Sequence, residues 1–155
     1  MTISRLRPAR PDETALLTDI AMRSKAHYGY DAAFMAACRD DLTITPDLIS
    51  HTTVIERDGV VCGFYVLRID AVNHNAELDF LFVAPEHIGR GCGRDLWGHV
   101  VARLPAAGVR TLWIVADPAA VPFYERMGAQ QVNTVLSSCV EGRTLPVMQF
   151  DVTES

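Results

Sequence analysis

The stretch LDFLFVAPEHIGRGCGRDLW, residues 78–97, decides the fold that we expect. Its first residues, 78–83, are apolar except for Asp79 and favour a buried strand, which Pro85 ends. Glycine then occupies positions 89, 91 and 93, where the missing Cβ atom lets the backbone adopt positive φ and approach a ligand closely. Apolar residues recur beyond the glycines at helical spacing, at Leu96, Trp97, Val100, Val101 and Leu104. The stretch therefore predicts a strand, a glycine loop and a helix.

A glycine loop that leads into a helix N-terminus is a ready site for a phosphate group. Two common nucleotide motifs do not fit this loop. The dinucleotide motif G-x-G-x-x-G fails because Arg94, three residues after Gly91, is neither Gly nor Ala, and the motif G-x-x-x-x-G-K-[ST] does not occur. The loop is therefore a phosphate site of another kind, or a plain turn between a strand and a helix.

The composition is that of an ordinary globular chain. With 155 residues, 49% of them hydrophobic and 21% charged, the sequence suits a single domain over residues 1–155. The formal net charge of −5 argues against nucleic acid as a partner. We expect a cytoplasmic protein without a membrane partner, because no apolar run has membrane-spanning length and the N-terminus lacks a signal-peptide core. The four cysteines form no C-x-x-C pair or zinc-like cluster, so no metal is expected.

Hydrophobic periodicity and turn residues predict the element order β-α-α-β-β-β-α-β-α-β-β, an α/β fold with a mixed sheet. The clearest local feature is Asp58-Gly59, a hairpin turn between two expected strands. Strands are expected at residues 2–7, 52–57, 60–67, 78–83, 111–115, 131–138 and 144–151. Helices are expected at residues 11–24, 32–39, 93–104 and 118–128, with one further helical turn from Thr45.

Two segments resemble motifs of the GCN5-related N-acetyltransferases, the GNAT superfamily. Val83-Ala84-Pro85 followed by Ile88-Gly89-Arg90-Gly91-Cys92-Gly93 is similar to the family's pyrophosphate loop, Q/R-x-x-G-x-G/A after Val-x-Pro, with Ile88 in place of Gln or Arg. Residues 117–129 are similar to N-x-x-A-x-x-F-Y-x-x-x-G-F/A, with Asp117 in place of Asn. The element order also matches, so the whole chain resembles a small bacterial-type member. The resemblance implies a mixed, mostly antiparallel sheet with helices on both faces.

The resemblance implies an acetyl-CoA-dependent N-acetyltransferase that moves an acetyl group to a primary amine by direct attack in a ternary complex. The pantetheine arm would lie between the strands that end at Val83 and Val115, which splay apart in this family. The residues that the resemblance places against CoA are Leu81, Phe82, Val83, Ile88, Gly89, Arg90, Gly91, Cys92, Gly93, Arg94, Asp117, Ala120, Phe123 and Tyr124.

Tyr124 stands where the family often has a general-acid tyrosine. Its phenol, with an ordinary pKa near 10, is protonated at neutral pH and can donate a proton to the departing thiolate. Packing of the helix together with Phe123 is the alternative role. The side chain of Asp117 can cap the helix, but it lacks the donors of an amide.

The candidate bases are Glu77 and Asp79, which share one face of the expected strand because side chains alternate with period two. Burial of an acid in an apolar strand would raise its pKa towards a useful range. Alternatively, these acids orient the substrate or pair with an arginine. His27, His74 or a chain of water molecules are further candidates for the base.

The resemblance implies an acceptor pocket built from residues 25–35. Within it, His27, Tyr28, Tyr30 and Phe34 suit a small polar and aromatic pocket for a small-molecule amine, although the rings could instead pin two helices to the sheet. A non-catalytic acyl-CoA-binding or sensing protein of the same fold is the alternative function. Many relatives pair through their terminal strands, so a homodimer through residues 131–151 is left open.

Overall fold

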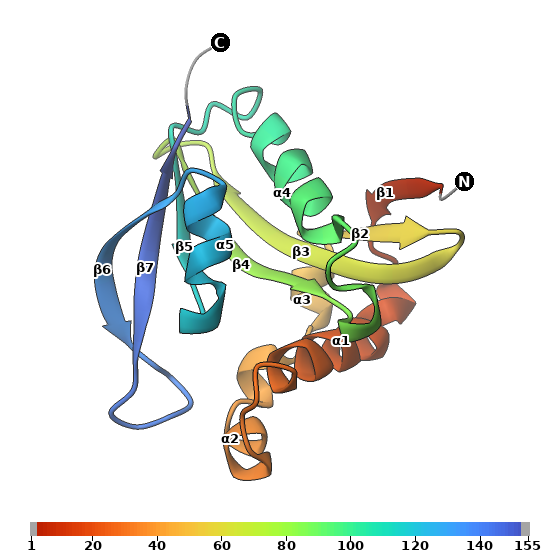
Figure 1. Cartoon of the computed structure of the whole chain (residues 1–155). Coiled ribbons are helices and arrows are strands. Elements are labelled where there is room, and N and C mark those ends of the chain that lie inside the picture. The colour runs from red at the N-terminus through yellow and green to blue at the C-terminus, as the bar shows by residue number, and fades with distance from the viewer. Residues whose placement is uncertain (1–2, 153–155) are drawn as a thin grey trace. The chain divides into compact units, whose positions relative to one another are not determined.

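The computed structural model describes residues 3–152 (Figure 1). The chain divides into two compact units. Unit 1 contains the chain up to Val66 together with Phe80–Leu96, and unit 2 contains Leu67–Asp79 together with the chain from Trp97 onwards. Strands β3 and β4 and helix α4 each run from one unit into the other. Among the described residues, no helix combines the length and the apolar character needed to cross a bilayer.

The elements follow the predicted order, and the predicted α/β class with a mixed sheet is confirmed. The strands are β1 (Ser4–Pro8), β2 (Thr52–Arg57), β3 (Val60–Asp70), β4 (Asn75–Val83), β5 (Thr111–Val115), β6 (Gln130–Leu136) and β7 (Thr144–Asp151). The helices are α1 (Thr14–Ala26), α2 (Ala32–Ala37), α3 (Pro46–Ile49), α4 (Cys92–Arg103) and α5 (Val121–Arg126). The strand order is β1-β2-β3-β4-β5-β7-β6, with β4 and β5 parallel and β1–β2, β2–β3, β5–β7 and β6–β7 antiparallel.

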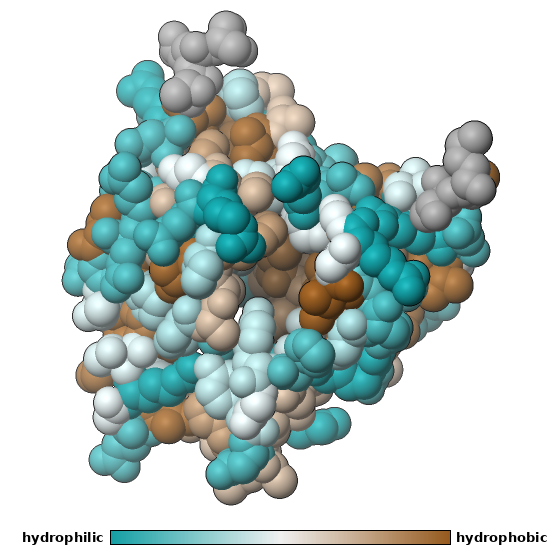
Figure 2. Space-filling model, viewed as in Figure 1, coloured by the Kyte–Doolittle hydropathy of each residue, from teal (hydrophilic) through white to brown (hydrophobic). Residues whose placement is uncertain are grey.

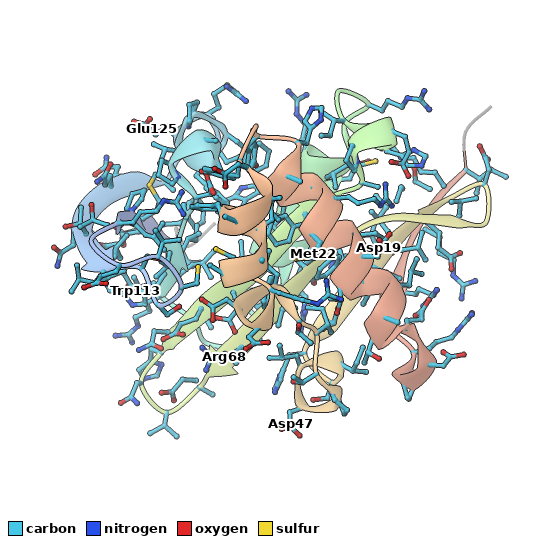
Figure 3. The ribbon with its side chains drawn as sticks, turned by 90° about the horizontal axis from the view of Figure 1, so that it is seen from below. Asp19, Met22, Asp47, Arg68, Trp113 and Glu125 are labelled. Atoms are coloured by element: carbon cyan, nitrogen blue, oxygen red, sulfur yellow. The ribbon has the colours of Figure 1, made fainter. Side chains whose placement is uncertain are left out.

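In unit 1, helix α1 lies across one face of the strands and the start of α4 lies on the other (Figures 1 and 3). The buried core includes Leu17 and Ile20 of α1 with Ile55 and Phe64 of the sheet. Strand β3 needs a glycine at position 63. A Cβ atom there would lie 2.8 Å from the carbonyl oxygen of Phe82 and 3.2 Å from Leu96 Cδ1. Gly63 therefore lets β3 approach both β4 and α4 closely.

In unit 2, strands β5, β7 and β6 continue the sheet from the first half of β4. The buried core includes Val100 and Leu104 of α4, Leu112 and Ile114 of β5, and Met148 of β7. Strand β6 lies at the edge of the sheet, and every residue in it is exposed. Hydrophilic residues are interspersed with hydrophobic ones over the face drawn in Figure 2.

The differences from the predicted bounds are at the ends of strands and helices. Strand β4 begins at Asn75, earlier than predicted, because residues 75–78 pair in parallel with residues 111–114 of β5. Strand β1 includes Pro8, which an edge strand tolerates. Thr2, the predicted first residue of that strand, lies outside the described residues. The helix predicted from residue 11 opens as a short 3₁₀ turn, Pro11–Glu13.

Candidate functional site

The glycine loop of unit 1 has the backbone that the sequence predicts. Gly89 and Gly91 both have φ of +83°, a conformation that L-residues with a Cβ atom rarely adopt. A Cβ atom on Gly89 would meet no heavy atom within 4 Å, so open space adjoins the loop there. Helix α4 begins directly after the loop at Cys92, and the amide of Asp95 donates to the carbonyl of Gly91 over 3.0 Å. The loop and the helix N-terminus together offer backbone N–H groups and a favourable dipole to an anion.

The other loop residues divide into exposed and buried side chains. Arg90 and Arg94 are exposed, and Ile88 is 47% exposed. The Cys92 side chain is buried, with its Sγ 3.7 Å from the Sγ of Cys62. Burial raises the pKa of the Cys62 thiol to about 12. Cys92 therefore has its backbone in the loop and its side chain in the core.

Arg57, at the end of β2, contacts the loop and was missed by sequence reasoning. Its Nη1 donates to the carbonyl of Arg90 over 2.5 Å, and its Nη2 lies 2.9 Å from Asp95 Oδ2 in the first turn of α4. The side chain is only 13% exposed. No local pattern in the sequence marks this residue, because its partners lie 33 and 38 residues further along the chain.

The end of β4 that leads to the loop is apolar and half-buried. It contains the predicted CoA contacts Leu81, Phe82 and Val83. The pairing of β4 with β5 covers only residues 75–78 of β4, and β4 then continues unpaired with β5 to Val83. Strand β5 ends at Val115, which is 51% exposed. Half-buried apolar residues at a strand end are the surface that an extended apolar ligand would cover.

The candidate bases Glu77 and Asp79 both pair with Arg68 of β3, which Figure 3 labels. Arg68 Nη2 donates to Glu77 Oε2 and also to Asp79 Oδ1, the latter over 3.1 Å, while Nε donates to Asp79 Oδ2. These hydrogen bonds, first of all the one to Asp79, raise the pKa of Arg68. The side chains of Arg68, Glu77 and Asp79 are 48%, 55% and 22% exposed. The structure therefore shows the arginine pairing that the sequence left open, and the role as base stays a prediction.

The sequence contains a signal that would have placed Arg68 near the two acids. Strands β3 and β4 are joined by the short turn at residues 71–74, so the register of a hairpin sets Arg68 opposite the acids of β4. His74 in that turn has φ of +57°, and its Nδ1 lies 3.1 Å from the carbonyl of Gly108. His27 ends α1 and is exposed.

Tyr124 of α5 is buried among aromatic rings of unit 2. Its ring centroid lies 5.8 Å from that of Trp97 and 5.3 Å from that of Phe123, both in edge-on geometry. Trp97 also packs edge-on against Phe150, with centroids 5.1 Å apart. These contacts fix the ring. The proton-donor role of its hydroxyl stays a prediction.

Asp117 caps the short 3₁₀ helix Pro118–Ala120, as predicted, by accepting a hydrogen bond of 2.9 Å from the amide of Ala119. Its other carboxylate oxygen lies 3.5 Å from Nη2 of Arg143. The cap and the arginine thus occupy both oxygens of the carboxylate. Ala120, the last residue of this turn, is half-buried.

Three of the predicted acceptor residues form an aromatic cluster in unit 1. The rings of Tyr30 and Phe34 stack with centroids 4.0 Å apart, and Tyr28 meets Tyr30 edge-on at 6.4 Å. The Lys25 ammonium lies over both stacked rings, 5.6 Å from the Tyr30 centroid and 5.9 Å from that of Phe34. The faces of these rings therefore already attract a cation.

The predicted residues belong to both units. Unit 1 contains the glycine loop, residues 80–83 and the aromatic cluster, and unit 2 contains Glu77, Asp79, Asp117, Ala120, Phe123 and Tyr124. Within residues 3–152, the His, Cys, Asp and Glu side chains form no group of three suited to a metal ion.

Comparison with known proteins adds sequence relatives and structural neighbours. The model of the acetyltransferase (GNAT) family matches residues 14–129. Mycothiol acetyltransferase of Streptomyces griseus subsp. griseus is 29% identical over 132 residues, which are 83% of this chain and 42% of that protein. Streptothricin acetyltransferase of Streptomyces lavendulae is 33% identical over 86 residues, 53% of this chain and 46% of that protein. This chain spans less than half the length of either relative.

Among solved structures, the PaiA N-acetyltransferase of Thermoplasma acidophilum, crystallised in complex with coenzyme A, is a neighbour over almost the entire length of both chains. The TM-score is 0.78 at 16% sequence identity, over 96% of this chain and 99% of that one. This likeness confirms the predicted fold.

Proposed function

Because this chain belongs to the acetyltransferase (GNAT) family, we propose that it is an N-acetyltransferase that transfers an acetyl group from acetyl-CoA to the primary amine of a small molecule. The observation that carries the proposal is the loop in which Gly89 and Gly91 both have φ of +83° directly before α4. Acetyl-CoA is the cofactor of this family, and its pyrophosphate is the anion for which such a loop is suited.

The residues of unit 1 fit CoA in three respects. Open space adjoins Gly89, so a phosphate can approach the backbone N–H groups of residues 89–93. The exposed guanidinium groups of Arg90 and Arg94 add positive charge beside those donors. The half-buried end of β4, with Leu81, Phe82 and Val83, offers an apolar surface to the pantetheine arm.

In the proposed reaction the amine attacks the thioester carbonyl directly, in a ternary complex. A C–N bond forms, the C–S bond breaks, and the amine loses one proton. We assign that proton to the carboxylate of Asp79, or to that of Glu77, and we assign donation of a proton to the departing sulfur to Tyr124. Both oxygens of Asp79 accept from Arg68, so for Asp79 to act as a base one of them takes the proton of the substrate on its second lone pair.

The acceptor proposal rests on the aromatic cluster of unit 1. Tyr28, Tyr30 and Phe34 lie together, and the Lys25 ammonium over the two stacked rings shows that their faces suit a cation. An amine that is protonated in water would be attracted to the same faces if it displaced the Lys25 ammonium, because two like charges repel each other over one pair of rings. His27, exposed at the end of α1, is proposed as a polar contact of that pocket. Streptothricin acetyltransferase, a relative over 86 residues, is named for a small-molecule acceptor.

The second candidate is a non-catalytic CoA-binding protein. The ion pairing of both candidate bases with Arg68 favours it, because their carboxylates already have a partner within the protein. Both candidates require CoA binding, and only the enzyme requires turnover.

The test measures thiol release from acetyl-CoA against a panel of primary amines. We expect turnover with at least one amine, and we expect Tyr124→Phe to lower kcat about 100-fold while the Kd for CoA stays within twofold. Tyr65→Phe, which changes a buried tyrosine of β3, is the matched control and should leave kcat unchanged. CoA binding without turnover on any amine would support the non-catalytic candidate. Unchanged kcat in Tyr124→Phe would remove the tyrosine from the mechanism.

Three further points remain predictions from the sequence. They are a single domain over residues 1–155, a cytoplasmic location, and a homodimer through residues 131–151. The exposed edge strand β6, which includes Leu136 at 75% exposure, gives the dimer a strand that a second copy can pair with.

A further inference from the structure

We propose that Arg57 positions the pyrophosphate-binding loop, holding its backbone in the conformation that receives the phosphates. The inference rests on the proposed function, since it concerns the same CoA site. Ile88, at the start of the loop, has no side-chain donor to do this. Arg57 reaches the loop from a different element, the end of β2.

The guanidinium of Arg57 holds two elements at once. Nη1 donates to the carbonyl of Arg90 in the loop over 2.5 Å, and Nη2 pairs with Asp95 in the first turn of α4 over 2.9 Å. A planar fork makes both contacts without bending, whereas a single ammonium cannot reproduce them. With 13% of its side chain exposed, Arg57 is shielded from most of the water that would compete for these bonds.

The contact with Arg90 fixes the direction of a donor in the loop. In a trans peptide the C=O and the following N–H point in opposite directions. Since the carbonyl of Arg90 points to Arg57, the N–H of Gly91 points away from it. A Cβ atom on Gly91 would lie 3.9 Å from Arg57 Nη2, so the loop backbone passes alongside the guanidinium. Arg57 thereby holds the loop backbone in its binding conformation before the anion binds, which lowers the entropic cost of binding.

The contact with Asp95 removes an electrostatic conflict. A carboxylate in the first turn of α4 benefits from the helix dipole, but it would repel a phosphate bound at the same helix end. Pairing with Arg57 neutralises that charge. In addition, Arg57 Nε is buried and has no hydrogen-bond partner within residues 3–152, so its N–H is an unused buried donor.

The first measurement is calorimetric binding of CoA to the full chain. We expect Arg57→Ala to raise the Kd for CoA about tenfold, and we expect faster hydrogen exchange at the amides of residues 89–93. Asp95→Asn should change the Kd by less than threefold, since Arg57 still holds the carbonyl of Arg90 and the lost carboxylate is one that would repel a phosphate. Arg39→Ala, which removes an exposed arginine of unit 1, is the control and should leave the Kd unchanged.

The second measurement separates positioning from general damage. S-acetylpantetheine carries the same thioester but no pyrophosphate. We expect Arg57→Ala to raise the KM for acetyl-CoA about tenfold without changing kcat, and to leave kcat/KM for S-acetylpantetheine within twofold of wild type. If Arg57→Ala does not fold, Arg57→Lys answers the same question, and we expect it to weaken CoA binding at least threefold.

Two results would overturn the inference. One is a folded Arg57 variant whose Kd for CoA stays within twofold of wild type. The other is an equal loss of kcat/KM with acetyl-CoA and with S-acetylpantetheine. A wild-type chain that binds no CoA would contradict the proposed function and the inference together, whereas wild-type binding with an unaffected variant contradicts the inference alone.

Discussion

Two clusters in the molecule have the same composition, one arginine with two carboxylates, and differ in their access to water. The cluster of unit 1 is Arg7 with Glu13 and Glu56, and the cluster of unit 2 is Arg68 with Glu77 and Asp79. In unit 1 the three side chains are 7%, 11% and 15% exposed, and in unit 2 they are 48%, 55% and 22% exposed. The two clusters therefore differ in burial and not in composition, and we expect their roles to differ for that reason.

The cluster of unit 1 is closed by hydrogen bonds. Arg7 makes a bidentate contact with Glu13, at 2.9 and 2.8 Å, and its Nε donates to Glu56 at 2.5 Å. Glu13 also accepts from the amide of Arg10 over 2.7 Å. The hydrogen bond from Arg7 is the main reason why the pKa of Glu13 is lowered. The cluster ties β1, β2 and the turn before α1 together, which is a structural role.

The carboxylates of the cluster in unit 2 can exchange their arginine partner for another cation. Water reaches Arg68 and Glu77, so replacing the arginine by a substrate ammonium leaves no buried charge unpaired. In the buried cluster, in contrast, removing Arg7 would leave two carboxylates without a compensating charge in the interior. The buried cluster therefore stabilises the fold, whereas the exposed cluster leaves room for the role that we propose for Asp79 and Glu77.

The largest effect on stability is expected in the buried cluster. Glu13→Gln keeps the shape of the side chain but removes the charged partner of the bidentate contact, while Arg7 keeps its pair with Glu56. Because a charge-assisted hydrogen bond is lost, the free energy of unfolding should fall by about 2 kcal/mol. Denaturant unfolding at pH 7 measures it. A change below about 1 kcal/mol would mean that the two clusters do not differ as proposed.

The same variant has a pH signature. Because the pKa of Glu13 is lower in the folded chain than its unfolded value of about 4.3, its ion pair stabilises the fold fully above that value. That stabilisation is lost as the pH falls through the folded pKa. The difference between wild type and Glu13→Gln should therefore be constant above about pH 5.5 and shrink below about pH 4.3. A difference that persists at pH 2 would point to packing instead of charge.

The next effect is expected in the exposed cluster and in kinetics. Asp79→Asn should lower kcat about 100-fold, the lower end of what a general base contributes, and leave the Kd for CoA unchanged. Steady-state kinetics with a responsive amine and calorimetry with CoA measure the two quantities. An unchanged kcat would show that Asp79 only pairs with Arg68.

What the sequence predicted well is local. Strands β2 and β5 have the predicted bounds, and the turn at Asp58-Gly59 has positive φ at both residues, 52° and 81°. The glycine loop was predictable for the same reason. Its proposed function depends on backbone conformation, and glycine at every second position indicates that conformation from the sequence alone.

What the sequence did not predict depends on contacts between distant residues. Arg57 contacts the carbonyl of Arg90, which lies 33 residues further along the chain. The sequence instead predicted Arg90 and Arg94, which lie in the loop itself, as the arginines of the site. Asp79 stood out as an acid in an apolar strand, but its partner Arg68 required the register of the neighbouring strand. Periodicity gives the face of a side chain and not its partner across the sheet.

The smallest effect is expected at Glu77, and it sharpens the contrast with Glu13. Both glutamates pair with an arginine, but Glu77 is 55% exposed and Glu13 is 11% exposed. Glu77→Gln should change the free energy of unfolding by no more than about 0.5 kcal/mol, and 1 M salt should erase that change because exposed charges are screened. Its effect on kcat should also be smaller than that of Asp79→Asn, since Glu77 is 55% exposed and Asp79 is only 22% exposed. If Glu77→Gln lowered kcat more than Asp79→Asn, the base would be Glu77, and the more exposed carboxylate would be the one that meets the amine.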